Sequence, residues 1–161
     1  MPDLFDDVVE LLDGLEREGV SYLIVGAFAL AVHGVERFTH DFDVVILPGP
    51  ENAERAWTAL AAWGAPLRTH GVTPADLARP GNVYQLGLPP RRIDVLNQIS
   101  GVDLADAAPR ALHAHFAGGL RPFLSVQDLV RNKRASGRTK DLLDLELLRE
   151  AGVDVDGVDA G

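Results

Sequence analysis

Hydrophobic residues recur along this chain with two different periods, and the switches between them predict an order of helices and strands. From Asp3 to Glu16 the apolar positions return every three or four residues, which is typical of an amphipathic helix. Residues 22–25 form a short apolar run that predicts a buried strand ended by Gly26. A compact apolar helix is expected over residues 28–32, because Gly34 suits its C-terminal end.

The middle of the chain continues with a strand and a helix. Residues 41–47 begin with aspartates that alternate with apolar side chains, and they predict a second strand ended by the Pro-Gly-Pro sequence at 48–50. Helical spacing over residues 51–63 predicts the next helix, which Gly64 closes. The stretch 65–81 shows no period that decides its structure.

Two pairs of strands are predicted in the C-terminal half. Residues 82–88 and 92–96 are joined by a Pro-Pro sequence and are typical of consecutive antiparallel strands. Residues 112–116 and 122–124 flank a Gly-Gly pair, which predicts another hairpin. The chain therefore mixes strands and helices along its length instead of separating them.

Two helices and a tail are expected at the C-terminal end. Ser125 followed by Asp128 resembles a capping box, so a helix is expected from there to about Ala135. Leucine spacing predicts a last helix over residues 140–150. The tail, residues 152–161, is acidic and rich in glycine, and we expect it to be frayed.

Length and composition predict one soluble domain over residues 1–161. A chain of 161 residues is long enough for a real core and too short for two independent ones. It contains no run approaching the roughly 18 apolar residues of a membrane span, and its acidic N-terminus precedes no signal-like core. We therefore expect a cytoplasmic protein with no membrane partner. With no cysteine, the sequence has no disulfide, thiolate metal site or cysteine nucleophile, so any metal must bind to oxygen or imidazole.

The charge is unevenly distributed. A net charge of −9 argues against non-specific coating of nucleic acid, which depends on many lysine and arginine contacts to phosphate. Residues 120–140 nevertheless form a basic segment with a single acid, Asp128. Its cations are Arg121, Arg131, Lys133, Arg134, Arg138 and Lys140.

Three aspartates interrupt predicted apolar strands. Asp41 and Asp43 stand two apart, so both carboxylates project from one face of their strand while Phe42 enters the core. Asp94 interrupts the strand at 92–96 in the same way, and a neighbouring position in the sheet would bring it beside the first pair. Carboxylates held this close repel one another, and a hard divalent cation would neutralise them. The alternative is that these acids are solvated or cap turns.

A strand, turn and helix just upstream add a candidate phosphate site. Backbone N–H groups at Gly26 and Ala27, where the turn meets a helix N-terminus, are able to face a phosphate. Alone this signal is weak, because a Gly-Ala step at a turn is common.

These segments together resemble the nucleotidyltransferase superfamily of the DNA polymerase beta-like type. The sequence VGAFALAVHGVERFTHDFDVVI resembles its first motif, a strand, a Gly-[Gly/Ser] turn, a short helix and Asp-x-Asp. RIDVL is similar to the second motif, which supplies the third carboxylate. Lys133, Arg138, Lys140, Asp141 and Asp144 resemble the third motif of the abortive-infection (AbiE-type) toxin nucleotidyltransferases.

The resemblance implies an α/β (α+β) nucleotidyltransferase fold, with a central mixed β-sheet flanked by helices and with C-terminal helices. It implies transfer of a nucleoside monophosphate from a nucleotide triphosphate such as ATP to an RNA or protein acceptor, with release of pyrophosphate. Asp41, Asp43 and Asp94 would hold Mg²⁺ or Mn²⁺ and form the catalytic set. Nucleotide-binding roles are implied for Gly26, Ala27, Arg37, Lys133, Arg138 and Lys140.

Two departures from the family pattern bear on activity. Ala27 replaces the usual second glycine or serine and removes a possible hydroxyl contact, although its N–H remains. The sequence also ends soon after the third motif, without the C-terminal domain and fourth motif of the full-length toxins.

Several side chains have structural alternatives. Lys133, Arg138 and Lys140 could form a solvated helix face paired with acids at helical spacing. Arg37 could anchor the loop before Asp41 instead of binding phosphate. The sequence alone leaves these alternatives open.

The histidines have alternatives as well. His33 is interpreted as a hydrogen bonder at a helix end instead of a catalytic base. His113 and His115 alternate as on a strand, a spacing that would suit zinc, yet the sequence offers them no clear third ligand.

Three functions compete. The leading hypothesis is an enzyme of a toxin–antitoxin or related system, in which a cognate toxin or antitoxin protein would be a partner. The second is a nucleotide-binding regulatory module of the same fold with weak or no catalysis. The third is an antitoxin-like nucleotidyltransferase that modifies a paired toxin.

Overall fold

The structure is a computed structural model that describes residues 4–37, 39, 41–88 and 92–158. Its strands form one mixed sheet in the order β3-β4-β2-β1-β6-β5. In chain order they are β1 (Tyr22–Val25), β2 (Asp41–Ile46), β3 (Val83–Leu86), β4 (Arg92–Leu96), β5 (Leu112–Phe116) and β6 (Gly119–Phe123). The helices are α1 (Leu4–Arg17), α2 (Gly26–Val32), α3 (Pro50–Trp63), α4 (Pro74–Ala78), α5 (Leu104–Ala107), α6 (Val126–Ser136) and α7 (Thr139–Glu150), with a 3-10 turn η1 (Ala108–Arg110).

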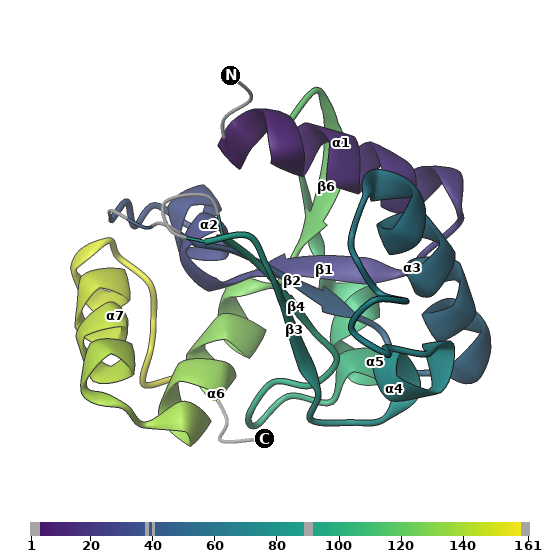
Figure 1. The fold of residues 1–161 in the computed structure, drawn as a ribbon. Helices are drawn as coiled ribbons and strands as arrows, with labels where there is room; N and C mark the ends of the chain where they lie inside the picture. The colour runs from purple at the N-terminus through teal and green to yellow at the C-terminus, as the bar shows by residue number, and fades with distance from the viewer. Residues whose placement is uncertain (1–3, 38, 40, 89–91, 159–161) are drawn as a thin grey trace.

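The sheet separates two groups of helices. Helices α1 and α3 pack together on one side, and α6 and α7 lie on the other (Figure 1). The predicted α/β fold with a central mixed sheet, flanking helices and C-terminal helices is confirmed. Within the part of the chain described here, no helix has the length and apolar character needed to cross a membrane.

Most predicted elements are confirmed, with small shifts at their ends. Helix α2 begins at Gly26, two residues before the predicted start, and β6 begins at Gly119 instead of residue 122. The structure adds helix α4 in the stretch without a clear period. Thr73 caps that helix by accepting a hydrogen bond from the N–H of Asp76, a signal that the sequence carried in Thr-Pro-x-Asp. The predicted Pro-Pro connection, residues 89–90, lies outside the described residues.

One continuous core joins the two sides of the sheet. At its centre four aromatic rings pack mostly edge to face, from Phe28 on α2 through Phe42 and Phe116 to Phe123. Phe42 and Phe123 are fully buried. Because Phe42 lies between Asp41 and Asp43, burying its ring fixes which face of β2 carries the two carboxylates.

The tail differs from the fraying that we expected over residues 152–161. Val155 is only 2% exposed and belongs to the core cluster. Arg134 on α6 donates hydrogen bonds to the carbonyl oxygens of Val155 and Val158. Residues 152–158 therefore pack against α6, because the apolar residues of GVDVDGV find a place in the core, and residues 159–161 lie outside the described residues.

A buried arginine attaches α1 to the β5–β6 hairpin. Arg121 is 1% exposed, and its Nη atoms lie 2.8 Å from Asp13 Oδ1 and 2.8 Å from Glu16 Oε2. It also donates to the carbonyl oxygens of Phe116, at 3.2 Å, and Ala117, at 2.7 Å. Since those two carbonyls belong to the hairpin, one side chain satisfies groups from both elements.

We predict that Arg121→Met, which keeps the volume, lowers the free energy of unfolding by about 2–4 kcal/mol because buried carbonyls lose their donor. Urea denaturation measures this change. Arg149→Met is the matched control, since Arg149 also contacts two acids, Glu146 and Asp156, but at the surface. It should cost about 0.5 kcal/mol or less. Equal losses in the two variants would contradict the structural role of Arg121.

Candidate active site

Two neighbouring strands bring the three predicted carboxylates together. Strand β2 pairs with β4 in parallel, with Asp43 directly beside Asp94 and Asp41 beside Arg92. Because alternate residues of a strand share a face, all four side chains project from the same side of the sheet. The expectation that a neighbouring strand places Asp94 beside the first pair is therefore confirmed.

These side chains form one wall of a cavity of about 820 Å³. The start of α2 forms a second wall, and residues of α6, α7 and the segment before α7 form a third. The nine residues predicted from sequence all line this cavity: Gly26, Ala27, Arg37, Asp41, Asp43, Asp94, Lys133, Arg138 and Lys140. The structure thus unites residues that are up to 114 positions apart in the sequence, from Gly26 to Lys140.

The clustered carboxylates perturb one another. Burial, together with the negative charges of Asp94 and Asp41, raises the pKa of Asp43 to about 6. Burial also raises the pKa of Asp94, where the charge of Arg92 acts in the opposite direction to that of Asp41. Lys140 lowers the pKa of Asp43 through its charge, which places this exposed lysine within electrostatic reach of the acids.

Arg92 is a member of the site that the sequence analysis missed. Its Nη2 lies 2.9 Å from Asp41 Oδ2, and its Nε lies 3.2 Å from Asp94 Oδ1. The second contact is an ion pair without hydrogen-bond geometry, since neither Nε nor Oδ1 has a hydrogen-bond partner in the structure. The available signal was the position of Arg92, two residues before Asp94 on the same strand face.

The donor set fits a hard divalent cation, but its oxygens are not arranged as a finished metal site. Over the described parts of the chain, no three acidic or imidazole side chains are grouped closely enough to hold a metal ion. Arg92 instead contacts oxygens of both Asp41 and Asp94. Three neighbouring carboxylates, two of which have raised pKa values (Asp43 and Asp94), are nonetheless the chemistry that Mg²⁺ or Mn²⁺ would satisfy, as is the buried Oδ1 of Asp94, which accepts no hydrogen bond.

The close approach of the Asp43 carboxylate explains why residue 26 is a glycine. Its φ of +68° lies in the left-handed region, and a Cβ built there would lie 2.3 Å from Asp43 Oδ2. Glycine therefore allows the carboxylate to rest against the start of α2. This gives Gly26 a steric reason that the sequence analysis, which considered only phosphate contacts, did not include.

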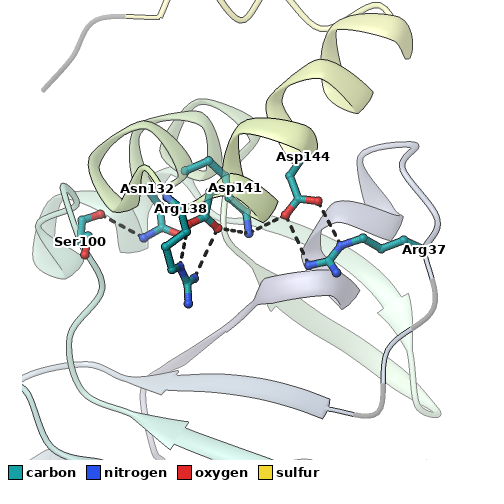
Figure 2. A network of polar contacts seen from close by, with 7 residues as sticks. Arg37, Ser100, Asn132, Arg138, Asp141 and Asp144 are labelled. Carbon is teal, nitrogen blue, oxygen red and sulfur yellow. Dashed lines mark hydrogen bonds and ion pairs between the residues drawn. The ribbon is translucent and has the colours of Figure 1, made fainter.

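Two cations of the basic segment, Lys133 and Arg138, are held by buried aspartates on α7. Lys133 is 4% exposed, and its Nζ lies 2.9 Å from Asp144 Oδ2 and 3.3 Å from Asp141 Oδ1. Figure 2 shows these acids between Arg138 and Arg37. The alternative interpretation paired Lys133 with Asp141 and Asp144, and that pairing is confirmed. Its solvated face is wrong for Lys133, because the folding of α7 against α6 buries the ammonium.

The two arginines complete the network from opposite ends. Arg37 Nε lies 3.1 Å from Asp144 Oδ1, so this residue does anchor the loop that leads to Asp41. Arg138 Nε donates to Asp141 Oδ2 at 2.8 Å, and the same carboxylate accepts from the Arg138 backbone N–H at the start of α7. Burial favours a higher pKa for Asp141, but Arg138 and Lys133 hold that pKa at about 2.

His33 makes a structural hydrogen bond, and His113 and His115 lie at the surface. His33 Nε2 hydrogen-bonds with the carbonyl oxygen of Leu124 at 2.9 Å, in agreement with its interpretation as a helix-end residue. His113 and His115 are exposed on the edge strand β5, and no metal-binding group that includes them is found among the described residues.

Comparison with solved structures gives the fold. A candidate nucleotidyltransferase from Thermotoga maritima, TM1012, matches with a TM-score of 0.54 and 17% identity, over 89% of this chain and 88% of that one. The antibiotic-resistance factor ANT(2'')-Ia matches with a TM-score of 0.56 and 16% identity, over 96% and 88%. An antigenic nucleotidyltransferase-like protein from Paracoccidioides brasiliensis matches with a TM-score of 0.50 and 14% identity, over 92% and 75%.

The chain therefore has the nucleotidyltransferase fold. No protein-family model matches the sequence, and no curated relative does. None of these three structures is described as an abortive-infection toxin, so that narrower resemblance rests on the motifs alone.

We predict that Asp43 makes the metal-free protein less stable as the pH rises. Its folded-state pKa of about 6 exceeds the ordinary value of 3.8, so the folded state binds the proton more tightly. The resulting stability is present below pH 4 and is lost as the pH rises through 6. With EDTA present, Asp43→Asn should therefore be roughly 1–3 kcal/mol more stable than wild type at pH 7.5, with a smaller difference at pH 4.5.

Urea denaturation at several pH values measures this dependence. Glu54→Gln removes an exposed carboxylate from α3 and serves as the control, which should show no such trend. A pH-independent difference between wild type and Asp43→Asn would contradict the electrostatic origin.

A second prediction tests the Gly26 contact. Gly26→Ala should lower the free energy of unfolding by about 2 kcal/mol or more, from left-handed strain plus the clash with Asp43. Gly71→Ala is the matched control, because Gly71 has a φ of +69° and nothing within 4 Å of its added Cβ. The control should lose about 1 kcal/mol. Thermal unfolding measures the stability of both variants. Equal losses in Gly26→Ala and Gly71→Ala would contradict the steric role of Asp43.

Proposed function

We propose that this chain transfers a nucleoside monophosphate from a nucleotide triphosphate to an acceptor hydroxyl and releases pyrophosphate, with Mg²⁺ or Mn²⁺ as cofactor. The observation that carries the proposal is the convergence of Asp41, Asp43 and Asp94 on one face of β2 and β4. A buried group of like charges costs stability, and a binding site for cations explains why the fold tolerates it.

In this proposal Asp41, Asp43 and Asp94 hold the cations. When bound, such cations neutralise triphosphate charge and lower the pKa of the attacking hydroxyl. Asp94 is on β4, which lies beside β2 and farther from α2 than the Asp41–Asp43 pair does. We therefore assign Asp94 to the acceptor side of the site. The acceptor oxygen forms a bond to the α-phosphorus, the bond from that phosphorus to the leaving pyrophosphate breaks, and the hydroxyl proton is lost.

The remaining cavity residues are assigned to the nucleotide. Gly26 and Ala27 line the cavity at the start of α2, and their backbone N–H groups are assigned to the outer phosphates. Lys140 is exposed at the opposite wall, where its charge already reaches Asp43. Lys133, Arg138 and Arg37 add positive potential while Asp141 and Asp144 fix their orientation.

The acceptor is proposed from the motif resemblance. We assign it to RNA or protein, in a toxin–antitoxin setting with a cognate partner protein. The acidic surface of this chain, with a net charge of −9, favours an acceptor recognised at the cavity over one bound by broad electrostatic attraction.

We predict that Asp94→Asn retains magnesium-dependent nucleotide binding but loses transfer by about a hundredfold or more, which corresponds to roughly 2.7 kcal/mol of transition-state stabilisation. The assay incubates the protein with each labelled nucleotide triphosphate, magnesium and cell extract, and follows label transfer together with pyrophosphate release. Wild type should release pyrophosphate and not orthophosphate.

The double variant Asp41→Asn/Asp43→Asn is the control for the cation site. Magnesium with a nucleotide triphosphate should raise the melting temperature of wild type and of Asp94→Asn, but not that of the double variant. If wild type binds nucleotide but transfers nothing, and Asp94→Asn behaves identically, the protein is a nucleotide-binding module and the transfer proposal fails.

A further inference from the structure

Arg92 is a cation in the middle of the site that the proposed function assigns to divalent metal ions. Its guanidinium contacts Asp41 Oδ2 at 2.9 Å and lies within ion-pair distance of Asp94 Oδ1 at 3.2 Å. The proposed function assigns these same oxygens to a divalent cation. A divalent cation bound to these carboxylates repels the guanidinium and reduces the negative charge that holds it, so the two compete for the same acids.

The position of Arg92 follows from the register of the sheet. Arg92 is the direct neighbour of Asp41 across the β2–β4 pairing and stands two residues before Asp94 on β4. Both relations place its side chain on the face that carries the acids. The contact therefore arises from backbone geometry and does not depend on a loop.

Partial burial strengthens this contact. The side chain of Arg92 is 29% exposed, and those of Asp41 and Asp94 are 31% and 13% exposed. Charges in such surroundings interact more strongly than at a free surface. Arg92 therefore offsets part of the repulsion among the three carboxylates and contributes to the stability of the metal-free protein.

We propose that Arg92 is an internal counter-ion of the acidic site, which divalent cations displace from Asp41 and Asp94 and which then binds a phosphate group of the incoming nucleotide. The first half concerns the metal site alone. The second half rests on the proposed function, because it requires a nucleotide triphosphate as ligand.

Charge balance explains why Arg92 would then bind a phosphate group. Two divalent cations outweigh the three carboxylates by one charge, so the attraction that holds the guanidinium at the acids is lost. Arg92 remains at the cavity wall, since β4 fixes its backbone. A phosphate oxygen is then the acceptor that a guanidinium matches best, because the fork of N–H groups binds phosphate in a bidentate manner.

The test of displacement is the affinity for Mn²⁺ alone, measured by calorimetry or electron paramagnetic resonance. Arg92→Gln should bind Mn²⁺ about tenfold or more tightly than wild type, because the competing cation is gone. Lys140→Gln is the matched control, since it removes an equal charge from the same cavity. Its affinity for Mn²⁺ should rise by about threefold or less, because an exposed charge is screened.

Arg92→Lys separates charge from geometry in the same measurement. A lysine at this position keeps the positive charge but loses the planar fork, so its Mn²⁺ affinity should lie between those of wild type and Arg92→Gln. If Arg92→Gln binds Mn²⁺ no more tightly than wild type, or no more tightly than Lys140→Gln, displacement is overturned. Circular dichroism of each variant establishes that it is folded.

The test of the phosphate contact is the affinity for a non-hydrolysable nucleotide triphosphate, measured with saturating Mn²⁺. Here the effect should reverse sign: Arg92→Gln should bind the nucleotide about tenfold more weakly than wild type, although it binds the metal more tightly. Unchanged nucleotide affinity in Arg92→Gln would overturn the phosphate contact. If wild type itself binds no nucleotide, the proposed function and the phosphate contact fail together, while the Mn²⁺ comparison still decides whether Arg92 is a displaceable counter-ion.

Discussion

Repulsion among Asp41, Asp43 and Asp94 is the constraint around which the polar half of this molecule is organised. The parallel register of β2 and β4 forces Asp43 beside Asp94, and burial keeps water from screening the two charges. Surrounding residues reduce that repulsion. Arg92 forms ion pairs with Asp41 and Asp94, and the charge of Lys140 lowers the pKa of Asp43. Gly26 leaves room for the Asp43 carboxylate. The same repulsion is the physical basis of the proposed cation site.

A second buried network determines where the C-terminal helices lie. Lys133 on α6 is held by Asp141 and Asp144 on α7, and Arg37 extends this network to the loop before β2. Breaking one partner would leave an uncompensated buried charge, so the two helices and the loop hold their positions together. This coupling fixes Lys133, Arg138 and Arg37 at the cavity that the three carboxylates also line.

The fold of this protein and its proposed function rest on different observations. Structural matches at 14–17% identity give the nucleotidyltransferase fold. Proteins that share a fold differ in activity, so the proposed transfer reaction depends on the geometry of the carboxylates, cavity and cations. Ala27 illustrates this separation, because a match of folds does not depend on the identity of one residue at the start of α2.

Sequence by itself determined the elements and the chemical identity of the site. Periodicity located most helices and strands, because apolar spacing reports directly on which face is buried, and the Asp-x-Asp spacing placed two carboxylates on one strand face. Only the tertiary structure decided what depends on contacts between distant segments. The pairing of Arg92 with Asp41, the burial of Lys133 by α7 and the packing of Val155 against α6 are such contacts, and no local pattern encodes them. Local spacing fixes the direction of a side chain, but its partner is fixed by strand register and helix packing, which arise only when the whole chain folds.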